Sequence, residues 1–253
     1  MKKSRRNGWA VLGGLVLGLT SSPVLAQGST VVGATSRMES PKNQMLEIKL
    51  GSIRPLINEE AGLGGNPYEE AFGSSGMLLL ELEMERYFYQ GIGTAGVGFS
   101  VGYAEKYGRA QVLDGSGNIT GDAAEATGLM VLPLRLHAVY RFDWAALKFN
   151  IPFVPYAKAG LAATPWWVSK GGELEEVDGK KAIGTRFGYA GTLGISFLMD
   201  FLEPRLARDF DSDLGVNHSY LFAEFTYADV NNFGREGLNL STRHWMFGLA
   251  LEF

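Results

Sequence analysis

The most persistent pattern in this chain is an alternation between apolar and small or polar residues, which is clearest over residues 184–201. This stretch reads GTRFGYAGTLGISFLMDF. Its odd-numbered positions are nearly all apolar and often aromatic, whereas its even-numbered positions are mostly small or polar. A period of two belongs to a β-strand, and a membrane-spanning helix would instead need about 20 consecutive apolar residues. The stretch therefore predicts a strand with one apolar face and one small, polar face.

The same alternation recurs in seven further segments, so the chain is expected to contain eight strands. In each segment the apolar residues occupy every second position. The segments are 46–50, 80–84, 97–103, 130–142, 153–161, 221–227 and 245–253. Pro133 interrupts the fourth strand, where a closed sheet has no free edge to tolerate a missing N–H, and this predicts a bulge or a shifted boundary there.

The rows opposite the apolar positions are rich in glycine, serine and alanine, with a few charges of both signs. A solvated strand face favours long charged or β-branched side chains, whereas the narrow interior of a small closed barrel needs small side chains and paired charges. We therefore expect an all-β fold, an eight-stranded antiparallel transmembrane β-barrel, rather than a soluble sandwich with two apolar inner faces. The charged network predicted for its lumen comprises Glu81, Glu83, Glu85, Arg135, Arg141, Lys158, Arg186 and Glu224. Glu47 and Lys49 occupy equivalent positions in the first strand.

The connections between the predicted strands alternate in length, which is typical of outer-membrane barrels with both chain ends in the periplasm. Connections 55–76, 105–127, 164–183 and 229–240 are long and polar, whereas 90–92 and 143–151 are short. The sixth connection, 202–217, is too long for a periplasmic turn, and its EPRLARDFDSDL segment predicts a short helix after Pro204. Asp209, Asp211 and Asp213 in this segment alternate like the start of a calcium loop, but a solvated turn is the favoured interpretation because the required glycine and glutamate are missing.

Length and composition fit one β-barrel domain that is exported from the cytoplasm. The chain has 253 residues, of which 46% are hydrophobic and 12% aromatic, with 34 glycines and no cysteine. Its first residues have a basic start, an apolar run from Trp9 to Leu19 and small residues up to Ala26. This predicts a signal peptide over 1–26, a periplasmic tail over 27–44 and the barrel over 45–253. The formal charge of −4 argues against a nucleic-acid partner.

Aromatic residues cluster near the ends of the predicted strands, where lipid headgroups would begin. Their rings are apolar, whereas their N–H and O–H groups favour water. Interface aromatics are therefore predicted at Trp144, near the periplasmic end, and at Trp166, Trp167 and Trp245, near the other end. Tyr87, Phe88, Tyr89 and Phe142 would join Trp144.

Three segments resemble known outer-membrane proteins. The terminal FGLALEF, ending in Phe253, resembles the signal by which the C-terminal strand engages the barrel-assembly machinery. The segment FVPYAKAGLAATPWW at 153–167 is similar to a strand of small barrels of the OmpA, OmpX and OmpW kind. The stretch LEPRLARDFDSDLGVNHSYLFAEF at 202–225 resembles an uncharacterised outer-membrane β-barrel family of myxobacteria and their relatives. The resemblance implies location in the outer membrane, with membrane lipids and lipopolysaccharide as partners, no cofactor and an unspecified oligomeric state.

Apparent catalytic motifs do not occur in the context that their chemistry requires. Residues 98–102, GFSVG, match a nucleophile elbow, but they lie within a strand rather than at a strand-to-helix turn. Residues 91–96, GIGTAG, match a phosphate-binding loop but precede a strand rather than a helix. No metal site is supported because His137, His218 and His244 lie on different strands. The remaining enzyme constellation, His244 with Ser241 or Thr242, would suit a lipid-A-modifying barrel.

An eight-stranded barrel is just wide enough to be filled by its own side chains, so a general diffusion pore is not expected. Our first hypothesis is a non-enzymatic scaffold that presents the loops 55–76, 105–127 and 164–183 for surface binding. The second is a carrier or channel for small apolar molecules with a lateral opening near Trp166 and Trp167. The third is a lipid-A-modifying enzyme. The sequence identifies no ligand for any of them.

Overall fold

The structure, a computed structural model, describes residues 43–60, 65–109, 111–113, 119–122, 125–149, 151–177, 179–202 and 215–253. The predicted signal peptide and nearly all of the predicted tail lie outside this part of the chain. The same is true of the helix predicted after Pro204 and of Asp209, Asp211 and Asp213. These assignments stay predictions.

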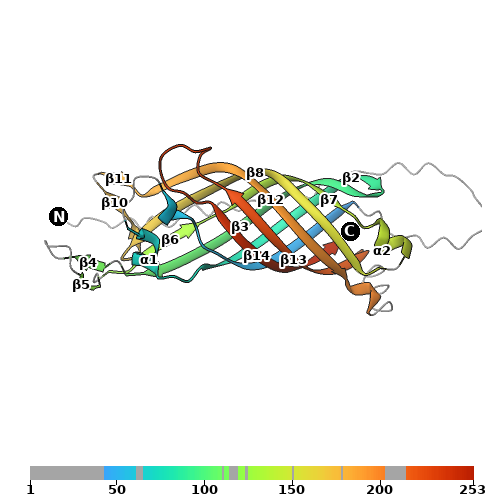
Figure 1. Cartoon of the computed structure of the whole chain (residues 1–253), viewed down its shortest axis with the longest axis horizontal. Coiled ribbons are helices and arrows are strands. Elements are labelled where there is room, and N and C mark those ends of the chain that lie inside the picture. Colours follow the sequence, from blue (N-terminus) through green and yellow to red (C-terminus); the bar gives the residue numbers. More distant parts are fainter. Residues whose placement is uncertain are drawn as a thin grey trace, which may run out of the picture. The chain divides into compact units, whose positions relative to one another are not determined.

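Eight antiparallel strands form a closed ring, and the fourth strand consists of two pieces (Figure 1). The ring closes because β1 pairs with both the second and the last strand, so that Ile48 lies opposite Leu82 on one side and Leu249 on the other. The predicted fold class is confirmed. The barrel strands are β1 (Gln44–Ile53), β2 (Met77–Gly91), β3 (Gly93–Gly108), β6 (Thr127–Val131) with β7 (Leu134–Arg141), β8 (Phe153–Lys170), β12 (Ile183–Leu198), β13 (His218–Asp229) and β14 (Thr242–Glu252).

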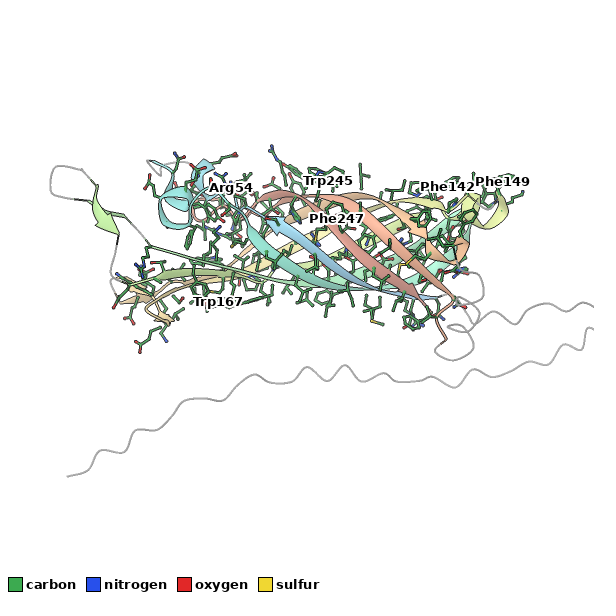
Figure 2. All side chains as sticks on the ribbon, turned by 90° about the horizontal axis from the view of Figure 1, so that it is seen from below. Arg54, Phe142, Phe149, Trp167, Trp245 and Phe247 are labelled. Carbon is green, nitrogen blue, oxygen red and sulfur yellow. The ribbon has the colours of Figure 1, made fainter. Side chains whose placement is uncertain are left out.

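The alternation in the sequence becomes an alternation between the inside and the outside of the barrel. On β2, Leu79 is 1% exposed whereas its neighbour Leu80 is 49% exposed. Outward positions on the barrel strands carry exposed leucine, isoleucine, valine, phenylalanine and tyrosine side chains, which project from the ring in Figure 2. A wall of this composition has the surface of a transmembrane barrel, whose lipid-facing positions are apolar.

Shorter elements lie at the two ends of the barrel (Figure 1). One end, which we call the loop end, carries η1 (Ile57–Glu59), α1 (Pro67–Phe72) and the pairs β4 (Gln111–Leu113) with β5 (Ile119–Asp122) and β10 (Glu176–Val177) with β11 (Lys180–Lys181). The opposite end, which we call the terminal end, carries Phe253, α2 (Trp144–Phe149) and η2 (Met199–Phe201). The residue pair β9 (Glu173–Leu174) extends the edge of β8. Among the described residues, no helix is long and apolar enough to cross a membrane.

Two connections differ from the sequence prediction. β8 continues to Lys170, so Trp166 and Trp167 belong to a strand rather than to the predicted loop that starts at residue 164. The connection 143–151 contains α2 instead of a simple short turn. In both cases the apolar residues of the segment find packing partners on the barrel, which the local pattern does not reveal.

Pro133 interrupts the fourth strand without shifting its register. Val131 pairs with Ala104 of β3 before the interruption, and Leu134 pairs with Val101 after it, as in an unbroken ladder. The Pro133 carbonyl still accepts a hydrogen bond from the Gly102 N–H at 2.8 Å. Of the two predicted alternatives, the bulge is therefore wrong, because the register is continuous, whereas a strand boundary does lie at this residue, between β6 and β7.

Candidate functional site

The lumen contains a buried layer of charged side chains contributed by five strands. Alternate positions of one strand face the same side, so Glu81, Glu83 and Glu85 of β2 all point inward. β1 contributes Glu47 and Lys49 by the same rule. The other members are Arg135 and Arg141 of β7, Lys158 of β8 and Glu224 of β13. We call these nine residues the charge layer.

Lys49 is the first centre of this layer. Its Nζ lies 2.6 Å from Glu83 Oε2, 2.9 Å from Glu224 Oε1 and 3.1 Å from Glu47 Oε2. Its side chain has no exposed surface. An ammonium group with no water contact requires compensating charges of this kind, because an isolated buried charge is very costly.

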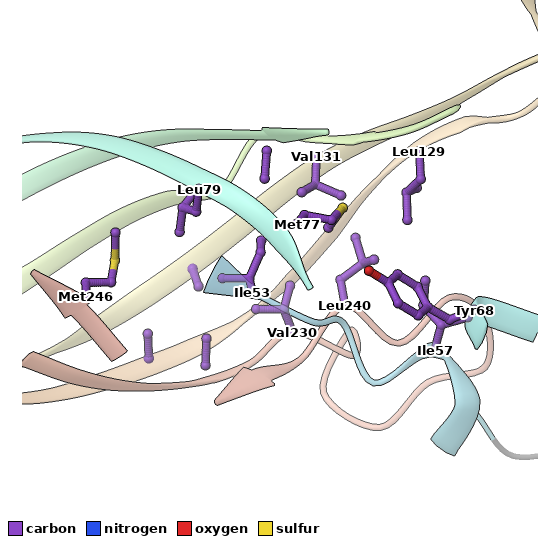
Figure 3. Packing of buried hydrophobic residues seen from close by; sticks show 14 residues of the cluster. Ile53, Ile57, Tyr68, Met77, Leu79, Leu129, Val131, Val230, Leu240 and Met246 are labelled. Carbon is purple, nitrogen blue, oxygen red and sulfur yellow. The ribbon is translucent and has the colours of Figure 1, made fainter. Parts of the chain in front are cut away.

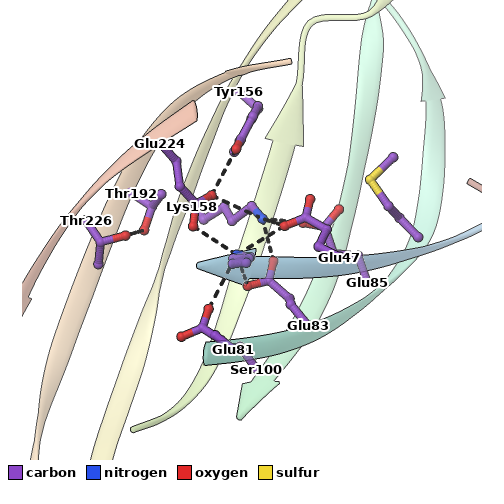
Figure 4. Close-up of polar contacts among 12 residues, drawn as sticks. Glu47, Glu81, Glu83, Glu85, Ser100, Tyr156, Lys158, Thr192, Glu224 and Thr226 are labelled. Atoms are coloured by element: carbon purple, nitrogen blue, oxygen red, sulfur yellow. Dashed lines mark hydrogen bonds and ion pairs between the residues drawn. The ribbon is translucent and has the colours of Figure 1, made fainter. Parts of the chain in front are cut away.

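Lys158 is the second centre and reaches across the lumen from the opposite side (Figure 4). Its Nζ lies 2.7 Å from Glu47 Oε2 and 2.8 Å from Glu85 Oε1, and it also donates to Glu83. Glu47 and Glu83 therefore each contact both lysines. The strands β1, β2, β8 and β13 are cross-linked through the interior as well as through their backbone ladders.

Two arginines extend the charge layer from β7. Arg135 pairs with Glu81, and its Nε donates to Ser100 Oγ at 3.2 Å. Arg141 Nη2 lies 2.5 Å from Glu47 Oε1, and its guanidinium carbon lies 4.5 Å from the ring centre of Tyr156. Ser100, the serine of the GFSVG motif, is thus a buried hydrogen-bond partner in the middle of a strand.

Arg186, which we predicted in this network, does not join it. The β12 residue opposite Lys158 is Thr192, and Arg186 lies six residues nearer the loop end. Arg186 Nη1 donates to the Glu236 carbonyl at 3.2 Å and thereby contacts the connection between β13 and β14. The alternation in the sequence predicts that Arg186 faces inward, but it does not indicate at which level along the barrel axis the side chain lies.

An apolar cap closes the lumen on the loop side of the charge layer (Figure 3). Ile57 of η1 and Tyr68 of α1 insert among inward residues of the strands, and Leu240 joins them from the connection before β14. The Tyr68 hydroxyl donates to the Ser75 carbonyl at 3.2 Å, and burial raises the pKa of this phenol while the nearby Arg54 opposes the shift. The remaining buried members are Ile53, Met77, Leu79, Ala104, Leu129, Val131, Ala162, Ala190, Ala228, Val230 and Met246.

Tyrosines close the lumen on the terminal side. Tyr87 donates to Glu85 at 2.7 Å, Tyr156 donates to Glu224 at 2.9 Å and Tyr220 donates to Glu252 at 3.1 Å. Ala146 of α2 belongs to the same apolar cluster as the three rings. Tyr87 was expected in an outward aromatic belt, but it is 6% exposed and faces the lumen.

Three buried side chains have the spacing of a metal site, namely Glu83, Glu85 and His137. However, Lys158 already lies between the two carboxylates, at 2.8 Å from Glu85 and in contact with Glu83. Its ammonium group takes the place that a cation would occupy. Glu83 and Glu85 are therefore better explained as structural parts of the charge layer, with His137 beside it at 3.2 Å from Glu83.

The histidines lie at different levels of the barrel. His218 is at the terminal end, where its Nδ1 lies 2.6 Å from Asp200 Oδ2. His244 is 5% exposed and faces the lumen, and neither of its ring nitrogens has a hydrogen-bond partner among the described residues. Ser241 instead donates to Asp229 at 3.1 Å. The constellation of His244 with Ser241 or Thr242 is thus not assembled on the lipid-facing surface.

A small cavity separates His244 from the apolar cap. The cavity has a volume of about 20 Å³, which is room for one or two water molecules. Its wall includes Pro133, Leu134 and Arg135 of the fourth strand together with His244.

The four tryptophans predicted at the membrane interface have different environments. Trp245 is 57% exposed on the outer wall. Trp167 lies 6.5 Å from the Tyr103 ring, and Trp144 of α2 lies 5.3 Å from the Phe149 ring. Trp166 faces inward and packs against the apolar cap, so its predicted place in an outer belt is wrong. Because successive residues of a strand face opposite sides, Trp166 and its neighbour Trp167 cannot both face outward.

Phe253 lies at the seam where the ring closes. Its N–H donates to the Gln44 carbonyl at 2.8 Å, and the Gln44 N–H donates back to the Phe253 carbonyl at 3.0 Å. The last residue of the chain therefore completes the pairing between β14 and β1.

Comparison with known proteins gives distant likenesses only. No protein-family model and no curated protein sequence matches the chain. Similar solved structures include the outer membrane protein OprG from Pseudomonas aeruginosa, at 13% identity and a TM-score of 0.45 over 85% of this chain and 97% of that one. Neisserial surface protein A has 12% identity and a TM-score of 0.42 over 83% and 97%. The outer membrane enzyme PagL has 11% identity and a TM-score of 0.38 over 83% and 99%. The fold assignment rests on the closed strand ring and its apolar wall.

Proposed function

We propose that this chain is a non-enzymatic barrel of the bacterial outer membrane that acts as a scaffold for its loop-end segments. The observation that carries the proposal is the filled lumen. Glu47, Lys49 and Glu81 in the charge layer have no exposed surface, and apolar residues lie on both sides of the layer. Because these buried layers fill the middle of the lumen, the loops and the outer wall are the parts that remain for function.

The proposal includes the orientation and the partners of the barrel. The loop end, with its longer connections, would face the cell exterior, and the terminal end would face the periplasm. Lipopolysaccharide and other outer-membrane lipids would surround the wall. The C-terminal strand ending at Phe253 would be the part that the assembly machinery engages.

Limited proteolysis of intact cells tests this arrangement. Trypsin added outside should cleave at Arg109, Lys180 or Lys181, which lie at the loop end. Lys148 of α2, at the terminal end, should be cleaved only after the outer membrane is opened. Cleavage at Lys148 in intact cells, with the loop-end sites protected, would reverse the orientation and refute the surface-display role.

A carrier of small apolar molecules is a second candidate, favoured by the cavity beside Pro133. Pro133 and Pro165 both lack the N–H that would otherwise pair the fourth strand with its neighbours, which weakens the wall next to an apolar interior. The opening would lie there rather than through the inward-packed Trp166. If apolar solutes pass at this point, Pro133→Val should slow their uptake into vesicles. An uptake rate that is the same for both chains, or no uptake by the unmodified chain, would refute the carrier role and keep only the scaffold role.

A further inference from the structure

A column of outward side chains on β13 and β14 changes from aliphatic to aromatic to cationic toward the loop end. Leu221 lies opposite Leu249, Phe225 lies opposite Trp245 and Tyr227 lies opposite Arg243. The Phe225 and Trp245 rings have their centres 5.4 Å apart. This order matches the change from acyl chains to headgroups across one leaflet.

Arg243 ends the column in an exposed position without an acidic partner among the described residues. Its guanidinium carbon lies 5.4 Å from the centre of the Tyr227 ring, so the ring supports one face of the planar group. The carboxylate that follows on β13, Asp229, accepts hydrogen bonds from Tyr189 at 2.9 Å and from Ser241 at 3.1 Å. It is therefore already engaged by two hydroxyl groups.

Arg54, the arginine next to Arg243 at the loop end of the barrel, has partners within the protein. Arg54 follows directly after β1, the strand that pairs with β14. It forms an ion pair with Glu69 and lies 5.8 Å from the Tyr68 ring centre, so it attaches α1 to the barrel. Of these two rim arginines, Arg243 is the one that remains available to an external anion.

We propose that Arg243, stacked on Tyr227 above Trp245, binds the phosphate of a lipid headgroup in the leaflet at the loop end. A guanidinium group binds phosphate through paired N–H donors, and its site here is continuous with a wall that fits acyl chains. The ligand class is a lipid with an exposed phosphate monoester. This inference rests on the proposed membrane location and adds a headgroup site to it.

Quenching of Trp245 fluorescence by brominated lipids tests the site. The full chain is placed in phosphatidylcholine nanodiscs with one-tenth brominated phosphatidic acid or, in parallel, one-tenth brominated phosphatidylcholine. Subtracting the signal of Trp245→Phe isolates the contribution of Trp245. One arginine near a membrane surface should enrich the phosphate lipid roughly fivefold, and quenching by phosphatidic acid should rise accordingly.

Two variants separate a local site from general charge attraction. Arg243→Gln should reduce the quenching by phosphatidic acid to that by phosphatidylcholine. Arg86→Gln removes an outward arginine from β2, near the opposite end of the wall, and should leave the excess quenching unchanged. Adding inorganic phosphate should not abolish the excess if the ligand is a lipid.

Each outcome decides the inference. The inference would be overturned if the unmodified chain showed no excess quenching by phosphatidic acid. It would also be overturned if the excess persisted in Arg243→Gln, or if Arg86→Gln lost it to the same extent. Equal quenching by the two lipids would remove the headgroup site but keep the membrane location. Absence of quenching by either lipid would overturn both.

Discussion

Lys158 of β8 and Glu47 of β1 meet across the lumen, with 2.7 Å between Nζ and Oε2, although their strands are not neighbours in the ring. Glu47 also accepts from Arg141 of β7 at 2.5 Å. The barrel interior is therefore a polar core in which ion pairs connect strands that are not neighbours in the ring. Breaking a buried pair costs more than forming it contributes, because the remaining charge has no water to solvate it.

Removing Arg135 should strongly destabilise the folded barrel. Arg135→Ala leaves Glu81 buried without its guanidinium partner, and we expect a loss of about 3–5 kcal/mol in the free energy of unfolding. The measurement is the denaturant midpoint of the barrel in detergent or lipid. Arg54→Ala is the control, since its ion pair with Glu69 is exposed and should contribute at most about 1 kcal/mol. An unchanged midpoint for Arg135→Ala would count against the charge layer.

Adjacent leucines of β2 should respond differently to truncation. Leu79→Ala creates a cavity in the apolar cap and should cost about 2–5 kcal/mol. Leu80→Ala, on the outer wall, leaves a gap that acyl chains can fill and should cost under about 1.5 kcal/mol. Both values come from unfolding in the same lipid. Equal costs would contradict the assigned orientations.

His244 should be replaceable by an apolar residue of similar size. Its imidazole is buried without a hydrogen-bond partner among the described residues, and the cavity beside it has room for only one or two water molecules, so the polar ring contributes little to stability. His244→Met should keep or raise the unfolding midpoint. Mass spectrometry should show the same lipid A in host cells that express the variant and in cells that express the parent chain. A large loss of stability would reveal a polar partner for the ring.

The barrel should not conduct ions, even without the η1 and α1 residues of its apolar cap. Replacing residues 57–72 with a glycine and serine linker removes η1 and α1, but the charge layer and the tyrosines beyond it still fill the lumen. Planar-bilayer recordings should therefore show no steady conductance steps for either chain. Regular steps from the unmodified chain would identify an open pore.

The sequence predicts the strands and their inward faces because one apolar wall requires a period of two along the whole strand. The three glutamates of β2 were identified by this rule alone. The height of a side chain along the barrel is not encoded in this way, since it depends on strand pairing, and Arg186 was misplaced for that reason. The phase errors at Tyr87 and Trp166 arose because an aromatic near a strand end looks the same facing in or out.

The apolar cap and α2 were missed for a different reason. Ile57, Tyr68 and Leu240 are isolated apolar residues in long polar connections, with no periodicity to indicate burial. Only the folded barrel provides the apolar rim against which they pack. The alternation placed Glu47 in the inward row, but its partners Arg141 and Lys158 come from strands that are distant in sequence.

Spin-label accessibility tests the central claim most directly, because the chain has no cysteine and each introduced cysteine carries the only label. Leu80, Leu82 and Phe99 are suitable outward positions, since their side chains are 46–50% exposed on the wall. In reconstituted vesicles, labels at these positions should collide readily with oxygen and poorly with a water-soluble nickel complex. High nickel accessibility at all three positions would show that water, not lipid, contacts the apolar row, and would contradict the account.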